Sequence, residues 1–211
     1  MVKIIALRLG KGRNKKASIL LDGKPSLKLE PEVAVKEGLK VGDELSDNRI
    51  AELNRASHHQ SCYDAALRYL DYRPRSEYEI RQRLYQHGFD GDSIKAAISR
   101  LKEQGLIDDG DFASFWRDNR QSFSPRSRWL VSLELKQKKV PEEVIEQVVS
   151  TIDDAENAYS VAQTKARSLA NCDDYQSFRR RLGDHLKRRG FGYGVIIKTV
   201  ERLWQEREGS R

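Results

Sequence analysis

The feature that most constrains this fold is a set of apolar residues that recurs three times with a spacing of 51 residues. Leu84, Leu135 and Leu186 anchor the three copies. Five further columns keep the spacing: Ile80/Val131/Leu182, Phe89/Val140/Phe191, Ile94/Ile145/Ile196, Ile98/Val149/Val200 and Leu101/Ile152/Leu203. At 38% apolar residues, a given column would be apolar in all three copies by chance only about 5% of the time, so the pattern indicates tandem copies of one unit.

Within each copy the apolar spacing is that of α-helices. Ile80 and Leu84 lie four residues apart on one helix, and Ile94, Ile98 and Leu101 mark one face of the next. A further helix is expected before each pair, around residues 61–72, 109–122 and 154–170. Each repeat is therefore predicted to contain three helices.

The middle helix of each repeat needs a residue at which to end. Gly88 in the first copy and Gly190 in the third occupy the same repeat position, and glycine is the residue that most readily ends a helix. Lys139 stands there in the second copy. We therefore expect that helix to stop differently, at Pro141.

The first 45 or so residues have a different pattern. Val2 to Leu9 and Ala17 to Leu21 resemble strands, and the polar joint at 11–14 is of the kind that connects a hairpin. Glu30-Pro31-Glu32 is expected to open a short helix that stops at Gly38, followed by a turn over 39–43. The predicted fold is mainly α, with three tandem three-helix repeats in an elongated array after a small β-rich N-terminal module. The predicted segments are a β-rich module at 1–46, a connecting helix at 47–60, and repeats at 61–107, 108–152 and 153–208.

The charge and cysteine content limit the possible partners and compartments. Lys and Arg outnumber Asp and Glu by 39 to 32, which gives a net charge of +7 and favours an acidic partner, either nucleic acid or protein. Cys62 and Cys172 lie far apart and suggest neither a disulfide nor a zinc site. The N-terminus is too short and too charged for a signal peptide, and no apolar run approaches about 18 residues. We expect a monomeric cytoplasmic protein that binds no membrane.

Basic residues can be sorted by their position on the expected helices. Arg73, Arg75, Arg126 and Arg128 fall at or before N-terminal ends, where a cation does not favour the helix dipole, and Arg75 and Arg126 share one repeat position. They either contact an anionic partner or are simply solvated. Lys at C-terminal ends complements the dipole instead. The candidate partner-binding residues are Arg73, Arg75, Arg81, Arg126, Arg128, Lys136, Arg180, Lys187 and Arg188. Arg13, Lys15 and Lys16 form a basic hairpin tip that either touches phosphates or keeps an edge strand soluble.

Aromatic residues lie among these basic ones. Tyr72, Tyr78, Tyr85 and Trp129 are candidates for stacking on unpaired bases, or they pack between helices. Phe112, Phe115 and Trp116 cluster in one helix and are expected in a core.

Evidence for catalysis is slight. His58 and His59 are expected in a polar joint between helices, and Asp108-Asp109-Gly110-Asp111 lacks the spacing of a calcium loop and is better explained by helix capping. The sequence contains no Walker, nucleophile-elbow or zinc-protease motif. We assign no catalytic, cofactor-binding or metal-binding residue and do not expect an enzyme.

Several segments together resemble the RecX family. They are RPRSEYEIRQRL at 73–84, Gly88-Phe89, LKEQGLIDD at 101–109 and RRGFGYGVI at 188–196, and the likeness runs from about residue 62 to 205. The second copy departs from the pattern, with Lys139-Val140 in place of Gly-Phe, and the N-terminal module is absent from shorter family members.

The resemblance implies a regulator of RecA in DNA repair, homologous recombination and the SOS response. The resemblance implies a protein that lies in the groove of the RecA filament on single-stranded DNA. There it would modulate, usually inhibit, ATP hydrolysis, strand exchange and filament growth. The expected partners are RecA and its filament, with weak direct DNA contact as an addition. The alternative is a helical-repeat protein that binds DNA without RecA. Which filament surface is bound, and the role of the N-terminal module, stay open.

Overall fold

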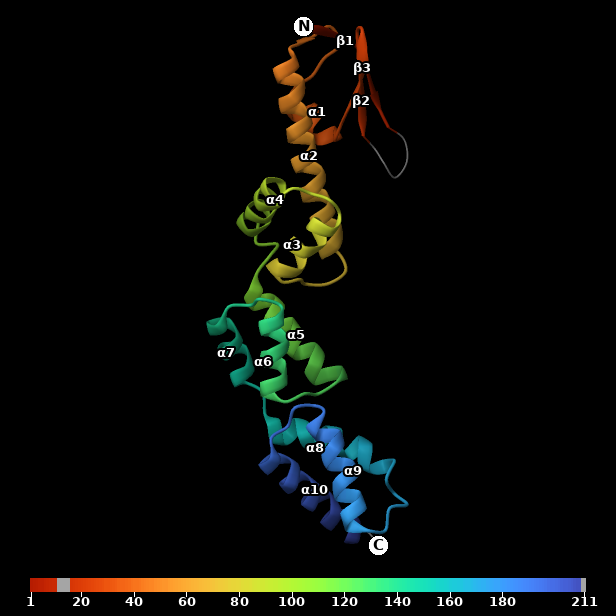
Figure 1. The fold of residues 1–211 in the computed structure, drawn as a ribbon, viewed down its shortest axis with the longest axis vertical. Helices are drawn as coiled ribbons and strands as arrows, with labels where there is room; N and C mark the ends of the chain where they lie inside the picture. The colour runs from red at the N-terminus through yellow and green to blue at the C-terminus, as the bar shows by residue number, and fades with distance from the viewer. Residues whose placement is uncertain (11–15, 210–211) are drawn as a thin grey trace. The chain divides into compact units, whose positions relative to one another are not determined.

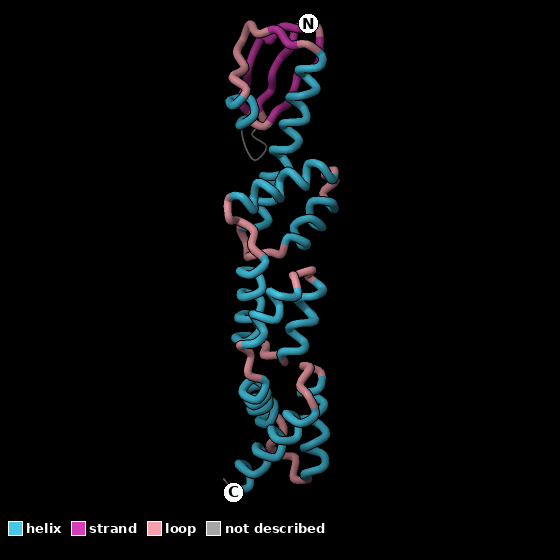
Figure 2. The backbone as a smooth tube through the Cα atoms, turned by 90° about the vertical axis from the view of Figure 1, so that its left-hand side faces the viewer, coloured by secondary structure: helices cyan, strands magenta, loops and turns pink. Residues whose placement is uncertain are grey.

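The protein is described by a computed structural model of residues 1–10 and 16–209, and its contacts divide into two units. Unit 1 comprises Met1–Arg73 and Glu79–Ile107, and unit 2 comprises Pro74–Tyr78 and the chain from Asp108 onward. Helices make up most of both units, and the strands of the described chain are confined to the N-terminal part of unit 1 (Figures 1 and 2). The predicted joint at 11–14 and the residues Arg13 and Lys15 lie outside the described residues.

A small antiparallel sheet forms the N-terminal module. Its strands are β1 (Val2–Leu9), β2 (Ala17–Leu21), β3 (Lys24–Leu29) and β4 (Glu44–Leu45), in the order β3-β2-β1-β4. The first two strands and the helix α1 (Pro31–Lys36) confirm the predictions, whereas β3 and β4 were not predicted. One face of the sheet is buried under α1 and the start of the next helix, because Ile4, Ile19 and Leu29 pack with Val33 and Leu53.

The helix α2 (Asp47–Leu70) belongs to two cores in succession. Leu53 packs in the core of the sheet, and Cys62 and Ala66 pack in the core of the first repeat. Leu53 and Cys62 are nine residues apart, about 180° around an ideal helix, so the apolar stripe changes sides halfway along α2. The helix expected over 47–60 and the one expected over 61–72 are therefore one continuous helix. His58 and His59 lie inside it, so their expected place in a joint was wrong.

The three tandem repeats each enclose a core of their own. The first repeat is formed by the second half of α2 with α3 (Glu77–Gln86) and α4 (Gly91–Glu103); the second by α5 (Asp109–Phe123), α6 (Arg128–Gln137) and α7 (Glu142–Ser150); and the third by α8 (Asp154–Arg167), α9 (Tyr175–Lys187) and α10 (Tyr193–Glu208). In the six predicted columns, every residue is buried except Phe89 and Ile196, which are half-buried. The 51-residue pattern thus marks the cores of the repeats.

All three middle helices end with the same backbone conformation. Gly88 and Gly190 both have φ +83°, and Lys139 at the same position has φ +58°, the left-handed region that glycine favours. The next residue then bonds back in each copy. Val140 N–H donates to the Leu135 carbonyl at 3.2 Å, as Phe89 does to Leu84. The expectation that the second copy stops differently was therefore wrong, because the lysine adopts the conformation instead of avoiding it.

Paired aspartates begin α5 and α8 and connect them to earlier helices. Asp108 and Asp153 cap their own helices, since Asp108 Oδ1 accepts from Asp111 N–H at 2.8 Å and Asp153 Oδ1 accepts from Ala155 N–H at 2.8 Å. The aspartate that follows each one accepts from the first residue of a middle helix: Asp109 from Glu77 N–H at 3.1 Å, and Asp154 from Arg128 N–H at 2.6 Å. Capping is confirmed as the role of Asp108, and the pairs also join successive helical hairpins.

Candidate partner-binding surfaces

The four arginines predicted at N-terminal helix ends do not share one environment. Arg73 Nη2 lies 3.1 Å from Glu79 Oε1, and the Glu79 side chain is only 9% exposed. The ion pair gives the Arg73 charge a partner within unit 1. Arg75, which precedes α3, and Arg81, which lies within α3, are both half-buried.

Arg126 belongs to a charged cluster in unit 2. It forms an ion pair with Glu134, a buried carboxylate on α6 that also accepts from Trp116 Nε1 at 2.7 Å and from Arg120 Nε at 2.8 Å. Burial lowers the pKa of the Arg126 guanidinium, and the neighbouring charges of Arg120 and Arg189 lower it further. The ion pair with Glu134 gives Arg126 a structural reason for its place at a helix start. This pair was not predicted from the sequence, because Glu134 follows Arg126 by eight residues and no local spacing rule relates the two.

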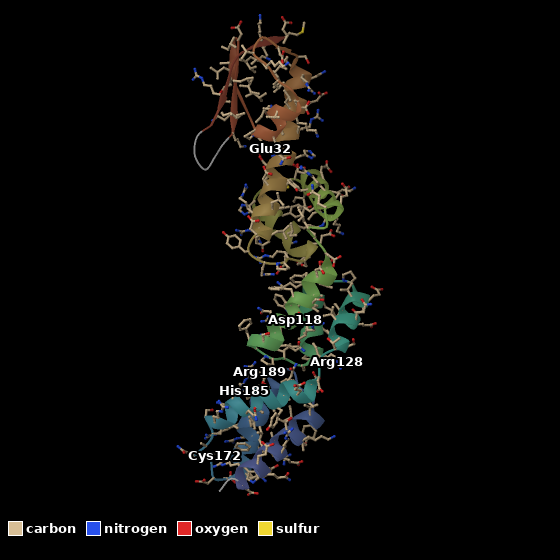
Figure 3. All side chains as sticks on the ribbon, turned by 180° about the vertical axis from the view of Figure 1, so that it is seen from behind. Glu32, Asp118, Arg128, Cys172, His185 and Arg189 are labelled. Atoms are coloured by element: carbon tan, nitrogen blue, oxygen red, sulfur yellow. The ribbon has the colours of Figure 1, made fainter. Side chains whose placement is uncertain are left out.

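Arg128 reaches from the first turn of α6 to the far end of α7. Its Nη2 donates to the Ile152 carbonyl at 2.8 Å and to the Ser150 carbonyl at 3.3 Å (Figure 3). A cation is unfavourable at a helix N-terminus and favourable at a helix C-terminus, where carbonyls lack partners. The charge of Arg128 therefore stabilises α7.

Lys136 lies on the surface of the second repeat. Its Nζ is 2.7 Å from Glu142 Oε1, and both side chains are about half exposed. Solvent screens such a pair strongly, so it leaves the lysine able to exchange partners.

The remaining predicted residues are exposed cations on α9 and its C-terminal cap. Arg180 and Lys187 are seven residues apart, close to two helical turns, so they lie on one face of α9. That face borders a groove of ≈ 250 Å³ between α9 and α10. Arg188 is the C-cap residue and is also exposed. Among the predicted partner-binding residues, Arg180 and Lys187 line the same groove. The groove itself was not predicted from the sequence.

Arg189, which was not predicted as a site residue, connects the second and third repeats. Its Nη1 donates to Ser124 Oγ at 3.0 Å and to the Pro125 carbonyl at 3.2 Å, and its own carbonyl accepts from Ser127 N–H at 3.1 Å (Figure 3). Gly190 follows, and a Cβ added there would lie 2.7 Å from Leu130 Cβ. The turn after α9 is therefore packed closely on the start of α6.

Several aromatic side chains are exposed to solvent. Tyr72 is 85% exposed, Phe123 83% and Trp129 63%. The exposure of Tyr72 excludes its packing between helices. Trp129 is packed in part, because its Cε3 lies 3.2 Å from the place that a Cβ on Gly190 would occupy. Phe123 was missed, although Tyr72 and Phe123 lie 51 residues apart, as do Tyr78 and Trp129. The repeat register alone could have identified it.

Other aromatic predictions concern the second repeat. Phe112 is fully buried in its core, as predicted, and its ring lies 5.7 Å from that of Trp116. Trp116 is half-buried and packs against that core, and its Nε1 donates to Glu134. Phe115 is also half-buried but is not among the residues of the core, so its expected place there was wrong.

A group of carboxylates lies where α1 begins against α2. Glu30, Glu32 and Asp64 place carboxylate oxygens within 4.8 Å of one another. Burial raises the pKa of Asp64, a hydrogen bond from Gln60 lowers it, and the neighbouring charges of Glu32 and Glu30 raise it. Glu30 also accepts from Ser61 Oγ, and its backbone N–H donates to Ser57 Oγ at 2.8 Å, so Glu30 ties the module to α2.

The cysteines and histidines have ordinary structural surroundings. Cys62 and Cys172 are free thiols, and burial raises the pKa of Cys62 to about 11, which disfavours its reactive thiolate at neutral pH. His58 Nε2 lies 2.9 Å from Asp90 Oδ2, and its ring packs 5.3 Å from that of Phe89. None of the helices in the described part of the chain combines the length and apolar character needed to cross a bilayer.

Comparisons with known proteins agree with this architecture. Models of the first, second and third three-helix domains of RecX match residues 62–101, 108–149 and 152–200. The chain is 30% identical over 205 residues to the regulatory protein RecX of Clostridium botulinum (strain Eklund 17B / Type B), covering 95% of this chain and 96% of that protein. It is 34% identical over 141 residues to the regulatory protein RecX of Chlorobaculum tepidum, covering 67% of this chain and 87% of that protein.

Two solved structures share the fold. A crystal structure of regulatory protein RecX matches with a TM-score of 0.73 at 23% identity, covering 95% of this chain and all of the other. RecX from Lactobacillus salivarius matches with a TM-score of 0.61 at 24% identity, covering 70% of this chain and 97% of the other. Because the first match covers 95% of the chain, it includes most of the N-terminal module.

The fold defines the class of protein: tandem three-helix repeats that follow a small β-rich module. The family models and the relatives then define the family. This chain belongs to the RecX family.

Proposed function

We propose that this chain binds RecA and RecA filaments on single-stranded DNA, and that it inhibits ATP hydrolysis, strand exchange and filament growth during DNA repair and recombination. It acts as a monomer in the cytoplasm. The observation that carries the proposal is membership of a family of regulatory proteins, seen in all three repeats and over nearly the whole length of a relative.

The repeated architecture suits a repeating target. A filament presents the same surface on each protomer, and tandem units joined in one chain can engage several such surfaces. Once one unit is bound, the next contacts are intramolecular, so modest individual contacts give high avidity. The net charge of +7 favours an acidic target.

Inhibition follows if binding favours one arrangement of neighbouring protomers. A ligand shifts a conformational equilibrium only by the difference between its affinities for the two states. A chain that spans protomers in one arrangement therefore resists the changes that ATP hydrolysis and strand exchange require.

The proposed contact residues fall into two groups. Arg180, Lys187 and Arg188 are exposed on the third repeat and are proposed as direct contacts. The second group is half-buried or has partners within the chain, and its members are proposed to contact the partner by sharing or exchanging their present contacts. This group consists of Arg73, Arg75, Arg81, Arg126, Arg128 and Lys136.

The test is RecA ATPase activity and strand exchange on single-stranded DNA with increasing amounts of the full chain. We expect both activities to fall as the chain is added. Unchanged activities when the chain saturates the filament would contradict inhibition, and absence of co-sedimentation with the filament would contradict binding.

A second candidate function is direct binding of single-stranded DNA without RecA. The exposed rings of Tyr72, Phe123 and Trp129 favour it, because exposed aromatic side chains near basic residues can stack on unpaired bases. A gel shift at physiological salt, with and without RecA, separates the two. Binding that requires RecA rejects the second candidate, and equal binding without RecA rejects the first.

A further inference from the structure

The groove between α9 and α10 combines an apolar floor with a basic rim. Ile196 and Ile197 of α10 are half-buried along it, and Tyr193 at the start of α10 is 72% exposed beside it. Arg180 and Lys187 line it from α9. At ≈ 250 Å³ the groove is large enough for a bulky side chain but small for a whole ligand.

Gly183 lies in the middle of α9 and lines this groove. Glycine in a helix interior destabilises the helix relative to alanine. Its backbone has no positive φ, and a Cβ added there would meet Ile196 Cγ2 at 3.6 Å, an ordinary contact. Arg81 and Ser132 occupy the same position in the other repeats. The fold therefore does not require glycine here, whereas an open groove does.

The charges around the groove are mostly positive. Arg179, Arg180 and Lys187 line it, against the single carboxylate of Asp184. In the described part of the chain, the ion pairs include none of these three cations. The rim is thus complementary to an acidic group that enters beside the apolar floor.

We infer that this groove holds an acidic segment of the partner protein, with one aliphatic or aromatic side chain against Ile196 and Ile197 and carboxylates facing Arg180 and Lys187. The inference rests on the proposed function and specifies the chemistry of that contact. Nucleic acid fits less well, because the aliphatic floor of Ile196 and Ile197 offers nothing for a sugar-phosphate backbone to bind.

The test compares variants of the full chain that differ in one groove property at a time. Arg180→Glu reverses a charge in the groove, and Arg181→Glu reverses the adjacent charge on another face of α9, so both change the net charge equally. Gly183→Ala and Gly183→Leu fill the groove progressively with residues that favour a helix. Circular dichroism and thermal melts establish that each variant folds.

Binding is measured by fluorescence anisotropy against RecA filaments on single-stranded DNA, and separately against the same DNA alone. We expect Gly183→Leu and Arg180→Glu each to weaken filament binding by about tenfold, with a smaller loss for Gly183→Ala, no loss of thermal stability for either Gly183 variant, and less than about twofold change for Arg181→Glu.

Three outcomes would overturn the inference while leaving RecA binding intact. The first is filament binding by Gly183→Leu equal to that of wild type, and the second is a loss of affinity for Arg181→Glu as large as that for Arg180→Glu. The third is an equal loss of binding to DNA alone for Gly183→Leu, which would assign the groove to DNA. Failure of the wild-type chain to bind filaments would instead reject the proposed function.

Discussion

Lys139 has the same backbone conformation as two glycines although its chemistry is different. At φ +58° its Cβ is crowded by the following carbonyl, which Gly88 and Gly190 avoid. The conformation is imposed by the end of α6, where Lys139 N–H donates to the Lys136 carbonyl at 3.0 Å and Val140 returns to the core. A residue unsuited to a conformation can hold it when its neighbours are fixed by burial.

Replacing this lysine by glycine should stabilise the second repeat. We expect Lys139→Gly to raise the free energy of unfolding by about 0.5 to 1 kcal/mol, because relief of the left-handed strain exceeds the added freedom of the unfolded chain. Urea unfolding followed by circular dichroism measures the change. Lys138→Gly, one residue earlier with φ −85°, is the control and should not stabilise. Equal effects of the two changes would contradict the argument.

The carboxylate of Asp90 makes the stability of the folded chain depend on pH. It caps α4, accepting from Ser93 N–H at 2.9 Å and from Ser93 Oγ at 2.8 Å, and these hydrogen bonds lower its pKa from 3.8 to about 2. Because the folded pKa lies below the unfolded one, the stabilisation is complete above the unfolded pKa of 3.8 and is lost as the pH falls through about 2.

Asp90→Asn keeps a capping side chain but removes the charge. We expect the variant to be less stable than wild type at pH 7 and the difference to shrink as the pH falls from about 4 to about 2. Urea unfolding at pH 7, 4, 3 and 2.5 measures it. Asp92→Asn removes a charge from the same first turn without touching the cap and serves as the control. A difference that stays constant with pH would show that the charge of Asp90 does not act through its hydrogen bonds.

At the scale of elements, α2 shows where an apolar pattern fails to predict a helix. The repeat columns could be found because each core faces one side of its helices, so burial recurs with the helical period. In α2 the apolar side changes from that of Leu53 to that of Cys62, and no single stripe runs through it. The sequence prediction divided α2 into a connecting helix and the first helix of the repeat, and only the packing of both faces shows one helix.

The turns after α3 and α9 provide a matched pair for testing the junction of the second and third repeats. Gly88 and Gly190 share φ +83°, but a Cβ at Gly88 meets nothing within 4 Å, whereas one at Gly190 meets Ser127 Oγ at 2.6 Å and Leu130 Cβ at 2.7 Å. Gly88→Ala should therefore cost only the conformational strain, about 1 kcal/mol.

Gly190→Ala should cost about 1 to 3 kcal/mol more, since Leu130 Cβ cannot rotate away and the turn must move off α6. Chemical unfolding measures the total, and hydrogen exchange at Ser127 N–H, which donates to the Arg189 carbonyl at 3.1 Å, reports the junction itself. Equal losses for the two variants, with unchanged exchange at Ser127, would show that the close approach does not stabilise the junction.

For the whole molecule, the repeats and their family could be predicted from the sequence, whereas the roles of individual cations could not. Arg126 and Arg128 were chosen because a cation does not favour a helix start, yet their charges meet Glu134 and the Ile152 carbonyl. Those partners lie at sequence separations that no local rule relates to the arginines. Exposure of Tyr72 and Phe123 likewise depends on the fold, although their shared register was present in the sequence.

The exposed rings of Tyr72 and Phe123 are expected to contribute two equivalent contacts to a multivalent interface. Tyr72 and Phe123 occupy the same position in successive repeats and are 85% and 83% exposed, so neither supports a core. We expect Tyr72→Ala and Phe123→Ala each to change stability by less than about 0.5 kcal/mol. If each ring contacts the same feature of successive filament protomers, each change should weaken filament binding about fivefold, and the double variant should lose roughly the product of the two.

Tyr85→Ala is the matched control, since Tyr85 is 55% exposed but its counterpart in the next repeat is Lys136. Anisotropy titrations against RecA filaments and against single-stranded DNA alone measure all four chains. Losses confined to filaments indicate protein contacts, and equal losses on DNA alone indicate base stacking. Removing two exposed aromatic contacts from a multivalent interface must lower its avidity. If the double variant binds filaments and DNA as wild type does, Tyr72 and Phe123 contact neither target.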